Sequence, residues 1–265
     1  MFGGVLVLAA VLVAVFAPAL APYEPEQIIV GHHLEAPSAT HIMGTDDVSH
    51  DVFSRLVFGS RISLFVGLLT ATLSALFGLI LGVFSAYVGK TFDLITQRLV
   101  DAMMSFPMLI LSLMLMAVMG RSLAAIIVAL VFVNVPRITR TVRSVAFTVK
   151  EEMYVDAARS IGAPPHRIIF RHVAPNCFAP VIILATATLG SAIVLESTLS
   201  FLGLGVPPNI PTWGGMLGNA SQGYFSGAWW VGAFPGIALT TVVFGVNLFG
   251  DMLRDILDPR LKGGR

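Results

Sequence analysis

Long runs of residues without charge limit what this chain can fold into more than any other feature. Four of them reach the roughly 20 residues that a helix needs to cross a bilayer: residues 2–21, 62–89, 102–120 and 173–195. Hydrophobic residues make up 56% of the 265 positions and charged residues only 12%, against about 25% charged in a soluble domain. These runs predict an all-α membrane protein rather than a water-soluble one.

Two further spans follow from the rest of the sequence. No charge occurs at 197–250, which is too long for one helix, and the Gly- and Pro-rich piece 203–223 separates a span at about 228–250. The uncharged piece between Arg121 and Arg137 is too short for the roughly 30 Å hydrocarbon core. We expect that helix to continue, with Arg137 and Arg140 extending their charges to the membrane surface. The prediction is one membrane domain, 1–265, with six transmembrane helices.

The positive charges predict the orientation, because cytoplasmic loops carry the excess of Lys and Arg. Of the 16 Lys and Arg residues, all but Arg55, Arg61 and Arg121 fall on one face of a six-span chain. That face holds both termini, the loop 137–177 and the tail 251–265, which we therefore expect in the cytoplasm. The loops 22–61 and 199–227 are expected outside. An alternative for residues 2–21 is a cleaved secretory signal, although no basic residue precedes them.

The basic loop carries a pattern of two short helices within residues 150–175. Gly162 is typical of a helix end, and Pro164-Pro165 can begin the next helix. Ala157 and Ala158 would keep one side of the first helix flat enough for another protein to approach closely. The plainer alternative is a solvated amphipathic connector.

This segment resembles the EAA loop of ABC importer permeases. Asp156-Ala157-Ala158, Gly162 and Pro175 have the spacing of the Glu-Ala-Ala, Gly and Pro of that loop. Asp156 stands in place of Glu, and His172 and Ala174 depart from the loop's Ile-x-Leu-Pro ending. Residues 171–176, Arg-His-Val-Ala-Pro-Asn, instead resemble the RHxLPN ending of the peptide-importer branch.

Three other segments resemble the dipeptide and oligopeptide "C" permeases of that branch, so the resemblance covers nearly the whole chain. Residues 44–64 are similar to a GTDxxGRDxxSRLxxGxRxSL opening, with Ser49-His50 in place of Gly-Arg. Residues 196–214 are similar to an outer ExxLSFLGLGxxPPxxxWG segment, and 258–261 to a DPRL tail.

The resemblance implies a type I ABC importer permease fold, like that of the methionine importer, in a prokaryotic cytoplasmic (inner) membrane. It implies a non-catalytic subunit that forms half of the pathway for di- or oligopeptides. The implied partners are a homologous second permease, two cytoplasmic ATPase subunits that bind ATP and Mg, and an extracytoplasmic solute-binding protein, besides membrane lipid. No cofactor is expected on this chain. The residues implied to couple it to the ATPases are Tyr154, Asp156, Ala157, Ala158, Arg159, Gly162 and Pro175.

Some outer residues are candidates for gating or for contact with the binding protein. They are Glu196, at the end of a span where an ionisable group is costly, and Asp46 and Asp51 in the long outer loop. We expect that loop to be folded and, with Trp213, Trp229 and Trp230, to form a docking platform.

The same loop holds His32, His33, His41 and His50, but their spacing matches no compact ligand pattern. No metal site is therefore predicted, and Cys177 is the only cysteine.

Other functions stay open at this point. With 16 basic and 15 acidic residues, the chain has no charge excess for nucleic acid. A nickel or metal-chelate ABC importer is the alternative within the same branch. An ion-coupled secondary transporter is the alternative of another class, but the six spans show neither internal repeats nor central charges. Gly78/Gly82 and Gly232/Gly236 form G-x-x-x-G steps, which predict close helix packing.

Overall fold

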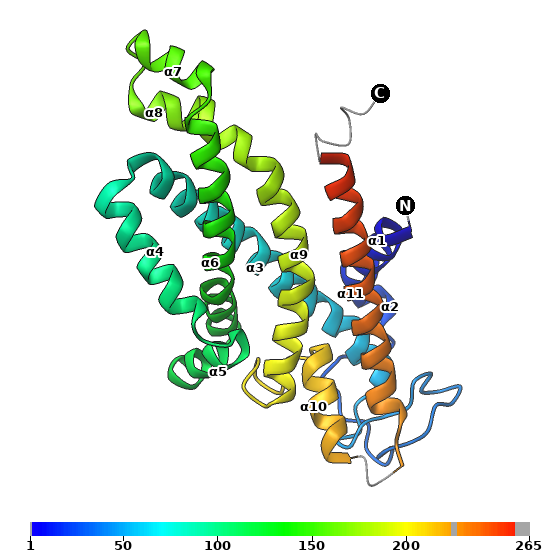
Figure 1. The fold of residues 1–265 in the computed structure, drawn as a ribbon. Helices are drawn as coiled ribbons and strands as arrows, with labels where there is room; N and C mark the ends of the chain where they lie inside the picture. Colours follow the sequence, from blue (N-terminus) through cyan, green and yellow to red (C-terminus); the bar gives the residue numbers. More distant parts are fainter. Residues whose placement is uncertain (1, 224–226, 258–265) are drawn as a thin grey trace.

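The computed structural model describes residues 2–223 and 227–257, and every regular element in them is a helix. The long ones are α3 (Val52–Val88), α6 (Leu123–Lys150), α9 (Ala174–Phe201) and α11 (Trp230–Leu257). The others are α1 (Phe2–Val15), α2 (Ala17–Leu20), α4 (Lys90–Met104), α5 (Met108–Met119), α7 (Met153–Ser160), α8 (Pro165–Ile168), the π-helix η1 (Ile169–Val173) and α10 (Trp213–Gly223). Figure 1 shows them as one helical assembly.

Side-chain caps and glycines set the ends of the long helices. Asp51 caps α3 by accepting a hydrogen bond from Ser54 N, and Ser122 caps α6 in the same way for Ala125 N. Such caps satisfy backbone N–H groups that have no partner within the helix. α3 ends at Gly89, whose φ of +65° reverses the chain directly into α4. The chain thus passes from α3 to α4 through Gly89 alone.

By length and composition, four helical segments of the described chain are able to cross a membrane. They are α3, α6, α11 and the continuous stretch Pro165–Phe201; α4 and α5 add a fifth if the bent pair is counted as one span. The predicted run 102–120 is not a single helix, because the chain bends by 93° between α4 and α5. Pro107 causes this break: it lacks an N–H and disfavours a helical conformation in Phe106 before it.

The first predicted span is helical but shorter than expected. α1 has 14 residues and ends before Pro18, where the missing N–H and the proline ring interrupt the helix. Six spans were predicted from hydropathy, but in the described residues fewer than six helical segments are long enough to cross a membrane.

Several helices extend beyond the predicted spans. α6 continues past Arg137 to Lys150, as its short uncharged stretch predicted. The connection to the next span is therefore shorter than the predicted loop 137–177. α3 begins ten residues earlier than predicted, at Val52 rather than Ile62, and the outer loop accordingly ends at residue 51. α11 reaches Leu257; the DPRL segment 258–261 lies outside the described residues.

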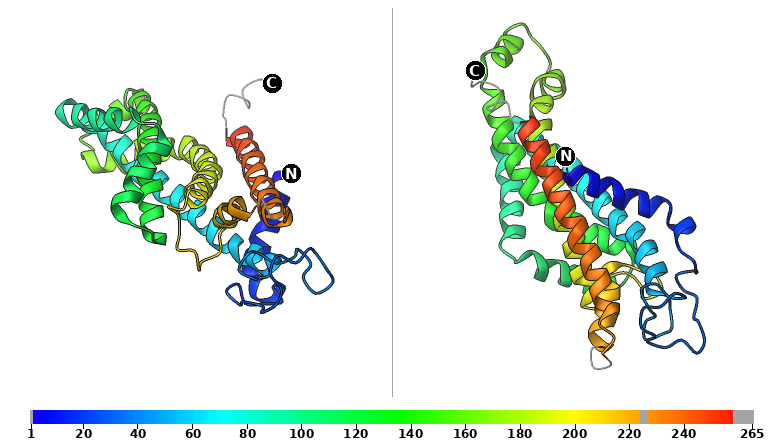
Figure 2. Two further views of the ribbon diagram at one scale, coloured as in Figure 1. Left: turned by 90° about the horizontal axis from the view of Figure 1, so that it is seen from below. Right: turned by 90° about the vertical axis from the view of Figure 1, so that its right-hand side faces the viewer.

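The helices place two groups of shorter elements at opposite ends of the molecule. α7 and α8 form a projection at one end, and the loop 21–51 and α10 lie at the other (Figures 1 and 2). Between them, α3 packs against α6 and α9, and Gly78 and Gly82 of α3 face Ile138 and Val142 of α6 at close range. Arg121 lies beside Gly203, which follows α9. Arg143 and Lys150 lie toward the α7 end of α6.

Candidate coupling helix and transport groove

α7 is a short helix held in place by its flanking turns. Glu152 precedes it in extended conformation, and Gly162 follows it with a φ of +79°. Ala163 N donates to Ala158 O at 3.0 Å and Gly162 N to Arg159 O at 2.9 Å, which is how left-handed glycines commonly close helices. A Cβ on Gly162 would meet no atom within 4 Å. The sequence therefore requires glycine there for backbone conformation, not for close contact.

One side of α7 packs against the membrane helices. Val155 is fully buried in a cluster that also includes Ile168 and Val173 after the break and Val142 of α6, and Ala158 is 8% exposed. The expectation that Ala157 and Ala158 together form a flat outward surface is wrong for Ala158. A helix period of 3.6 residues separates neighbouring positions by 100°, so Ala157 is exposed while Ala158 faces the core.

The exposed surface of this projection is mixed, because large apolar side chains stand among charged ones such as Asp156 and Arg159. Met153 is 86% exposed, Ile161 85% and Phe170 66%, with Tyr154 also exposed. We call these four residues the apolar face. Large apolar side chains that stay exposed on and beside a projection are candidates for burial against a partner protein.

The remaining predicted coupling residues stabilise α7 or tie it to α9. Arg159 Nη1 donates to Asp156 Oδ1 at 2.7 Å across one exposed turn. Asn176 Nδ2 donates to the Tyr154 hydroxyl at 3.2 Å and to His172 O at 2.6 Å. Pro175 lies just after η1 inside the continuous helical stretch Pro165–Phe201, where its missing N–H leaves one helical hydrogen bond unmade. A displacement of α7 would thus be passed to the start of α9.

Below α7, an ion pair joins three of the membrane helices. Arg143 of α6 donates to both carboxylate oxygens of Asp93 in α4, at 2.5 and 2.6 Å, and Ser85 of α3 donates to Asp93 Oδ1 at 2.5 Å. Lys150 Nζ reaches Ala86 O of α3 at 2.9 Å. Sequence reasoning missed this network, because it counted these charges only by sign and position in loops.

Glu196 lies inside the protein, near the C-terminal end of α9. Its side chain has no exposed surface and accepts hydrogen bonds from Ser200 Oγ at 2.8 Å, Ser63 Oγ at 3.4 Å and Ser197 Oγ at 3.4 Å. Trp213 N also donates to Ser63 Oγ. Glu196 thus connects α9, α3 and the start of α10, and in this conformation it has no surface to offer a docking protein.

Asp46 and Asp51 are buried as well, at 5% and 2% exposure. Asp46 accepts hydrogen bonds from His50 N and Val48 N and faces Arg55 Nη1 at 3.5 Å, whereas Asp51 caps α3. Contact of either carboxylate with a binding protein is therefore contradicted by their burial. Their part is to shape the outer loop.

The loop 21–51 is folded, as expected, and Trp230 ties it to α11, whereas Trp213 ties the start of α10 to α3. Trp230 Nε1 donates to Thr45 O and Trp213 Nε1 to Leu56 O, both at 3.1 Å. Both indoles are buried, whereas Trp229 is 60% exposed. Of the three tryptophans, only Trp229 therefore presents a large surface at this end.

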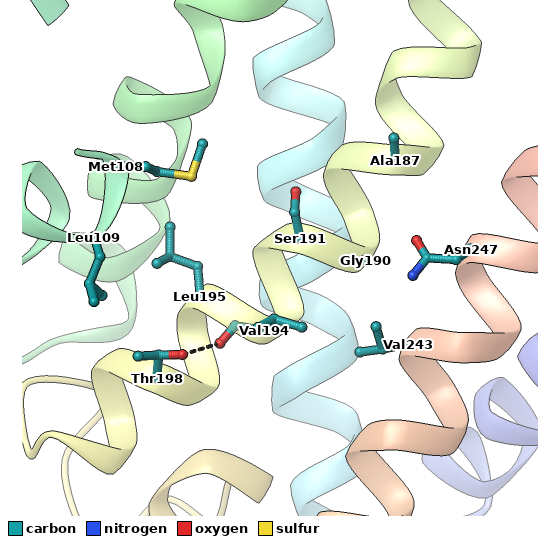
Figure 3. Close-up of a pocket in the computed structure, with 10 residues that line it drawn as sticks. All are labelled: Met108, Leu109, Ala187, Gly190, Ser191, Val194, Leu195, Thr198, Val243 and Asn247. Atoms are coloured by element: carbon teal, nitrogen blue, oxygen red, sulfur yellow. Dashed lines mark hydrogen bonds between the residues drawn. The ribbon is translucent and has the colours of Figure 1, made fainter. Parts of the chain in front are cut away.

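A groove of about 560 Å³ opens between α5, α9 and α11 (Figure 3). Most of its lining is apolar, but Ser191 and Thr198 of α9 and Asn247 of α11 add uncharged polar groups. Ser191 and Thr198 donate to carbonyls of their own helix. Asn247 approaches α9 where Gly190 leaves room, since a Cβ there would lie 2.9 Å from its Oδ1. The sequence alone did not reveal these polar groups as candidates for binding a substrate. Ser191 and Asn247 are each a single polar residue within an apolar run.

Comparisons with known proteins agree with this architecture. The family of binding-protein-dependent transport system inner membrane components matches residues 78–263, and the N-terminal TM domain of oligopeptide transport permease C matches residues 1–37. A putative peptide transport system permease protein of Brucella suis is 42% identical over 98% of this chain and 87% of its own. The dipeptide transport system permease protein DppC of Alkalihalophilus pseudofirmus is 40% identical over 98% of this chain and 85% of its own.

The same fold occurs in solved structures. A chain of the MetNI methionine ABC transporter in an inward-facing conformation superposes with a TM-score of 0.62 at 20% identity, over 77% of this chain and 96% of that one. The all-α type I importer permease fold predicted from the sequence is thereby confirmed. Because the family match covers well over half of the residues, this chain belongs to the binding-protein-dependent transport system inner membrane components, the non-catalytic permease subunits of ABC transporters.

Proposed function

We propose that this chain forms half of a pathway that imports di- or oligopeptides delivered by an extracytoplasmic binding protein. A homologous second permease supplies the other half, and two cytoplasmic ATPase subunits, which carry ATP and Mg, drive the pair. Relatives that cover 98% of the chain and are named as peptide and dipeptide permeases support the substrate class. Both termini and α7 lie in the cytoplasm in this proposal.

The apolar face on α7 and η1 is the observation that carries the proposal. It projects from the membrane helices on a rigid base, since Val155 is fully buried and the Tyr154 hydroxyl accepts a hydrogen bond from Asn176 of α9. A packed element of this kind transmits a rigid-body displacement rather than absorbing it. An ATPase seated on the apolar face would therefore move α9 through Asn176 when it closes on ATP.

The groove between α5, α9 and α11 is where we expect the substrate to pass through this subunit. α9, which receives the movement of α7, also contributes Ser191 and Thr198 to the groove. Uncharged polar groups among apolar ones suit a substrate that must be released after passage, because no fixed charge holds it. A second permease that covers the open side would complete the channel.

Reconstitution of the purified complex tests the function directly. The tagged chain is expected to copurify with a second permease and ATPases from its native membrane, and proteoliposomes are expected to take up labelled dipeptide only with ATP and the binding protein. Uptake driven by an ion gradient without ATP would support the secondary-transporter alternative. ATP-driven uptake of nickel chelate in place of peptide would support the metal-chelate alternative.

Cysteine labelling tests the orientation. Cys177 is fully buried, so the wild-type chain should give little background. An impermeant maleimide is expected to label Ala39→Cys in intact spheroplasts and Ala157→Cys only after lysis, because both positions are exposed but lie at opposite ends. Labelling of Ala157→Cys in intact spheroplasts would reverse the proposed orientation.

A further inference from the structure

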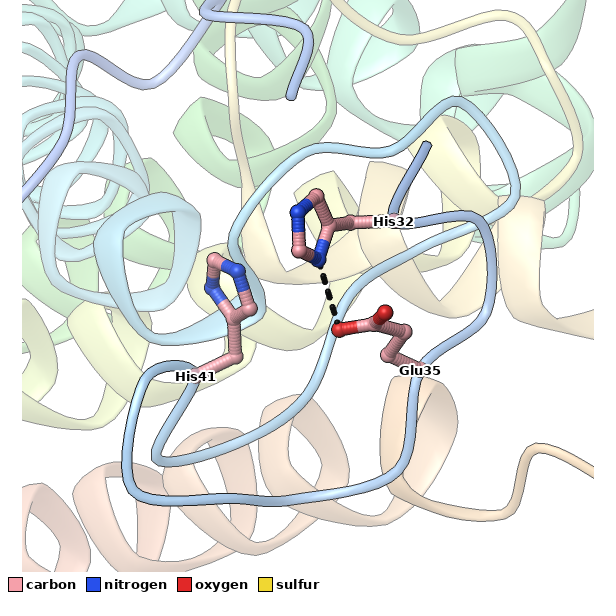
Figure 4. Close-up of side chains that lie close together, drawn as sticks. All are labelled: His32, Glu35 and His41. Atoms are coloured by element: carbon pink, nitrogen blue, oxygen red, sulfur yellow. Dashed lines mark hydrogen bonds and ion pairs between the residues drawn. The ribbon is translucent and has the colours of Figure 1, made fainter. Parts of the chain in front are cut away.

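Three side chains in the loop between α2 and α3 come together as a candidate metal site. A ligand atom from each of His32, Glu35 and His41 lies within 4.8 Å of the other two, and Figure 4 shows the three around one space. Histidine spacing alone predicted no site here. The spacing of the histidines takes no account of Glu35, and it does not show that the loop folds His41 back beside His32.

The first two ligands are already paired and held by the backbone. His32 Nδ1 lies 2.8 Å from Glu35 Oε2, and each side chain is about two-fifths exposed, at 42% and 40%. Thr45 fixes both residues, because its Oγ1 donates to His32 O at 2.5 Å and accepts from Glu35 N at 2.8 Å. A cation can therefore reach the pair from solvent without opening the loop.

The third ligand has a built support behind it. His41 is 2% exposed, and its Nδ1 lies 3.1 Å from Oδ1 of the buried Asp51. Asp51 is in turn held by Ser54 N and Ser54 Oγ, both at 2.8 Å. This contact orients the imidazole and leaves its other nitrogen with a free lone pair. Carboxylates orient metal-binding imidazoles in the same way in many metal centres.

Charge and ligand type agree on the kind of ion. Glu35 and Asp51 together supply two negative charges, which match a divalent cation. Two imidazoles and one carboxylate are the ligand set of Zn²⁺ and similar borderline transition metals, not of Mg²⁺ or Ca²⁺, which take mainly oxygen.

We propose that His32, Glu35 and His41 bind a divalent transition-metal cation of the Zn²⁺ class, with water at a fourth, solvent-facing position. Ligand atoms of a tetrahedral zinc site lie about 3.3 Å apart, for bonds of about 2.0 Å, so the half-exposed His32 and Glu35 side chains turn inward onto buried His41. A neutral His32 that binds the ion through Nδ1 carries its proton on Nε2, so the step needs no net loss of a proton. The ion then joins residues 32 and 41 and stabilises the loop 21–51.

Equilibrium dialysis of the purified transporter complex against Zn²⁺ alone tests this site. We expect one more tightly bound Zn²⁺ per copy of this chain in wild type than in His32→Gln or Glu35→Gln, with affinity reduced at least about tenfold in each variant. His33→Gln is the matched control, because this exposed neighbour lies outside the cluster, and it should bind Zn²⁺ as wild type does. His32 and Glu35 are half-exposed, so neither substitution should prevent folding.

A protease assay gives an independent readout. Zn²⁺ is expected to slow cleavage within residues 21–51 in wild type and His33→Gln, and to have no effect in His32→Gln. Equal Zn²⁺ affinity in wild type and His32→Gln, or an equal loss in His33→Gln, would overturn the site. Neither readout depends on transport, so failure here is distinct from failure of the proposed peptide import.

Discussion

Glutamate in place of both Met153 and Ile161 is expected to release the ATPase subunits and reduce ATP-driven uptake to background. These side chains are 86% and 85% exposed, so the change should leave the fold of the chain intact. Burial of each in an interface is worth about 1.5–3 kcal/mol. Loss of both weakens association by at least about 100-fold, since 1.4 kcal/mol is a factor of ten, and the two buried carboxylates add a further cost.

Copurification of the ATPases with the tagged chain measures this effect. Val30 and Ile42, 89% and 62% exposed in the outer loop, provide the matched control, because glutamate at both makes the same chemical change at the other end of the molecule. The control should retain its ATPases. Wild-type recovery of ATPases with the Met153/Ile161 variant would show that the apolar face is not where they bind.

The difference between Ala157 and Ala158 shows what the motif could predict. Its spacing correctly placed a helix with a glycine end, but the second predicted short helix, which begins at Pro165, is continuous with α9 and is therefore the start of the next span. The motif did not give the rotation of α7, which depends on where Val155 meets Val142 and Ile168. Ala158 consequently belongs to the packed side, and a bulky substitution there tests packing before it tests docking.

Hydropathy predicted which segments are apolar but not where each helix begins, ends or bends. α3 starts early because Asp51 caps it, a polar signal that a search for uncharged runs discards. α4 and α5 are separated because Pro107 interrupts an apolar run that is otherwise uniform. In both cases a single residue decides the backbone, and its effect is lost in a windowed average.

Contacts between distant positions were beyond such reasoning. Asp93 and Arg143 are 50 residues apart and Ser63 and Glu196 are 133 apart, so their pairing depends on how the helices pack. For the same reason Glu196, Asp46 and Asp51 were predicted as residues for gating or for contact with the binding protein, without any sign that all three are buried. A carboxylate beside a membrane span does not by its sequence reveal whether it faces water or serine hydroxyls.

Gly82→Ala is expected to destabilise the folded chain strongly, by about 1–3 kcal/mol or more. A Cβ at Gly82 would lie 2.8 Å from Thr139 O and 2.7 Å from Val142 Cβ. A backbone carbonyl and a Cβ cannot rotate away, so α3 and α6 would have to move apart along the contact that buries Val83 of α3 with Ile138 and Val142 of α6. The ion pair between Asp93 and Arg143, which spans α4 and α6 beside α3, would be strained as well.

Gly236→Ala is the matched control, because the sequence places Gly236 in an equivalent G-x-x-x-G step. There a Cβ would meet only Leu217 Cδ2, at 3.8 Å, which is ordinary contact. Alanine also favours a helix over glycine by about 1 kcal/mol, so this variant should be as stable as wild type or more so. Thermal unfolding of the purified chains in detergent measures both. Equal loss of stability in the two variants would mean that helix composition, rather than the close approach of α3 to α6, determines which glycines this fold requires.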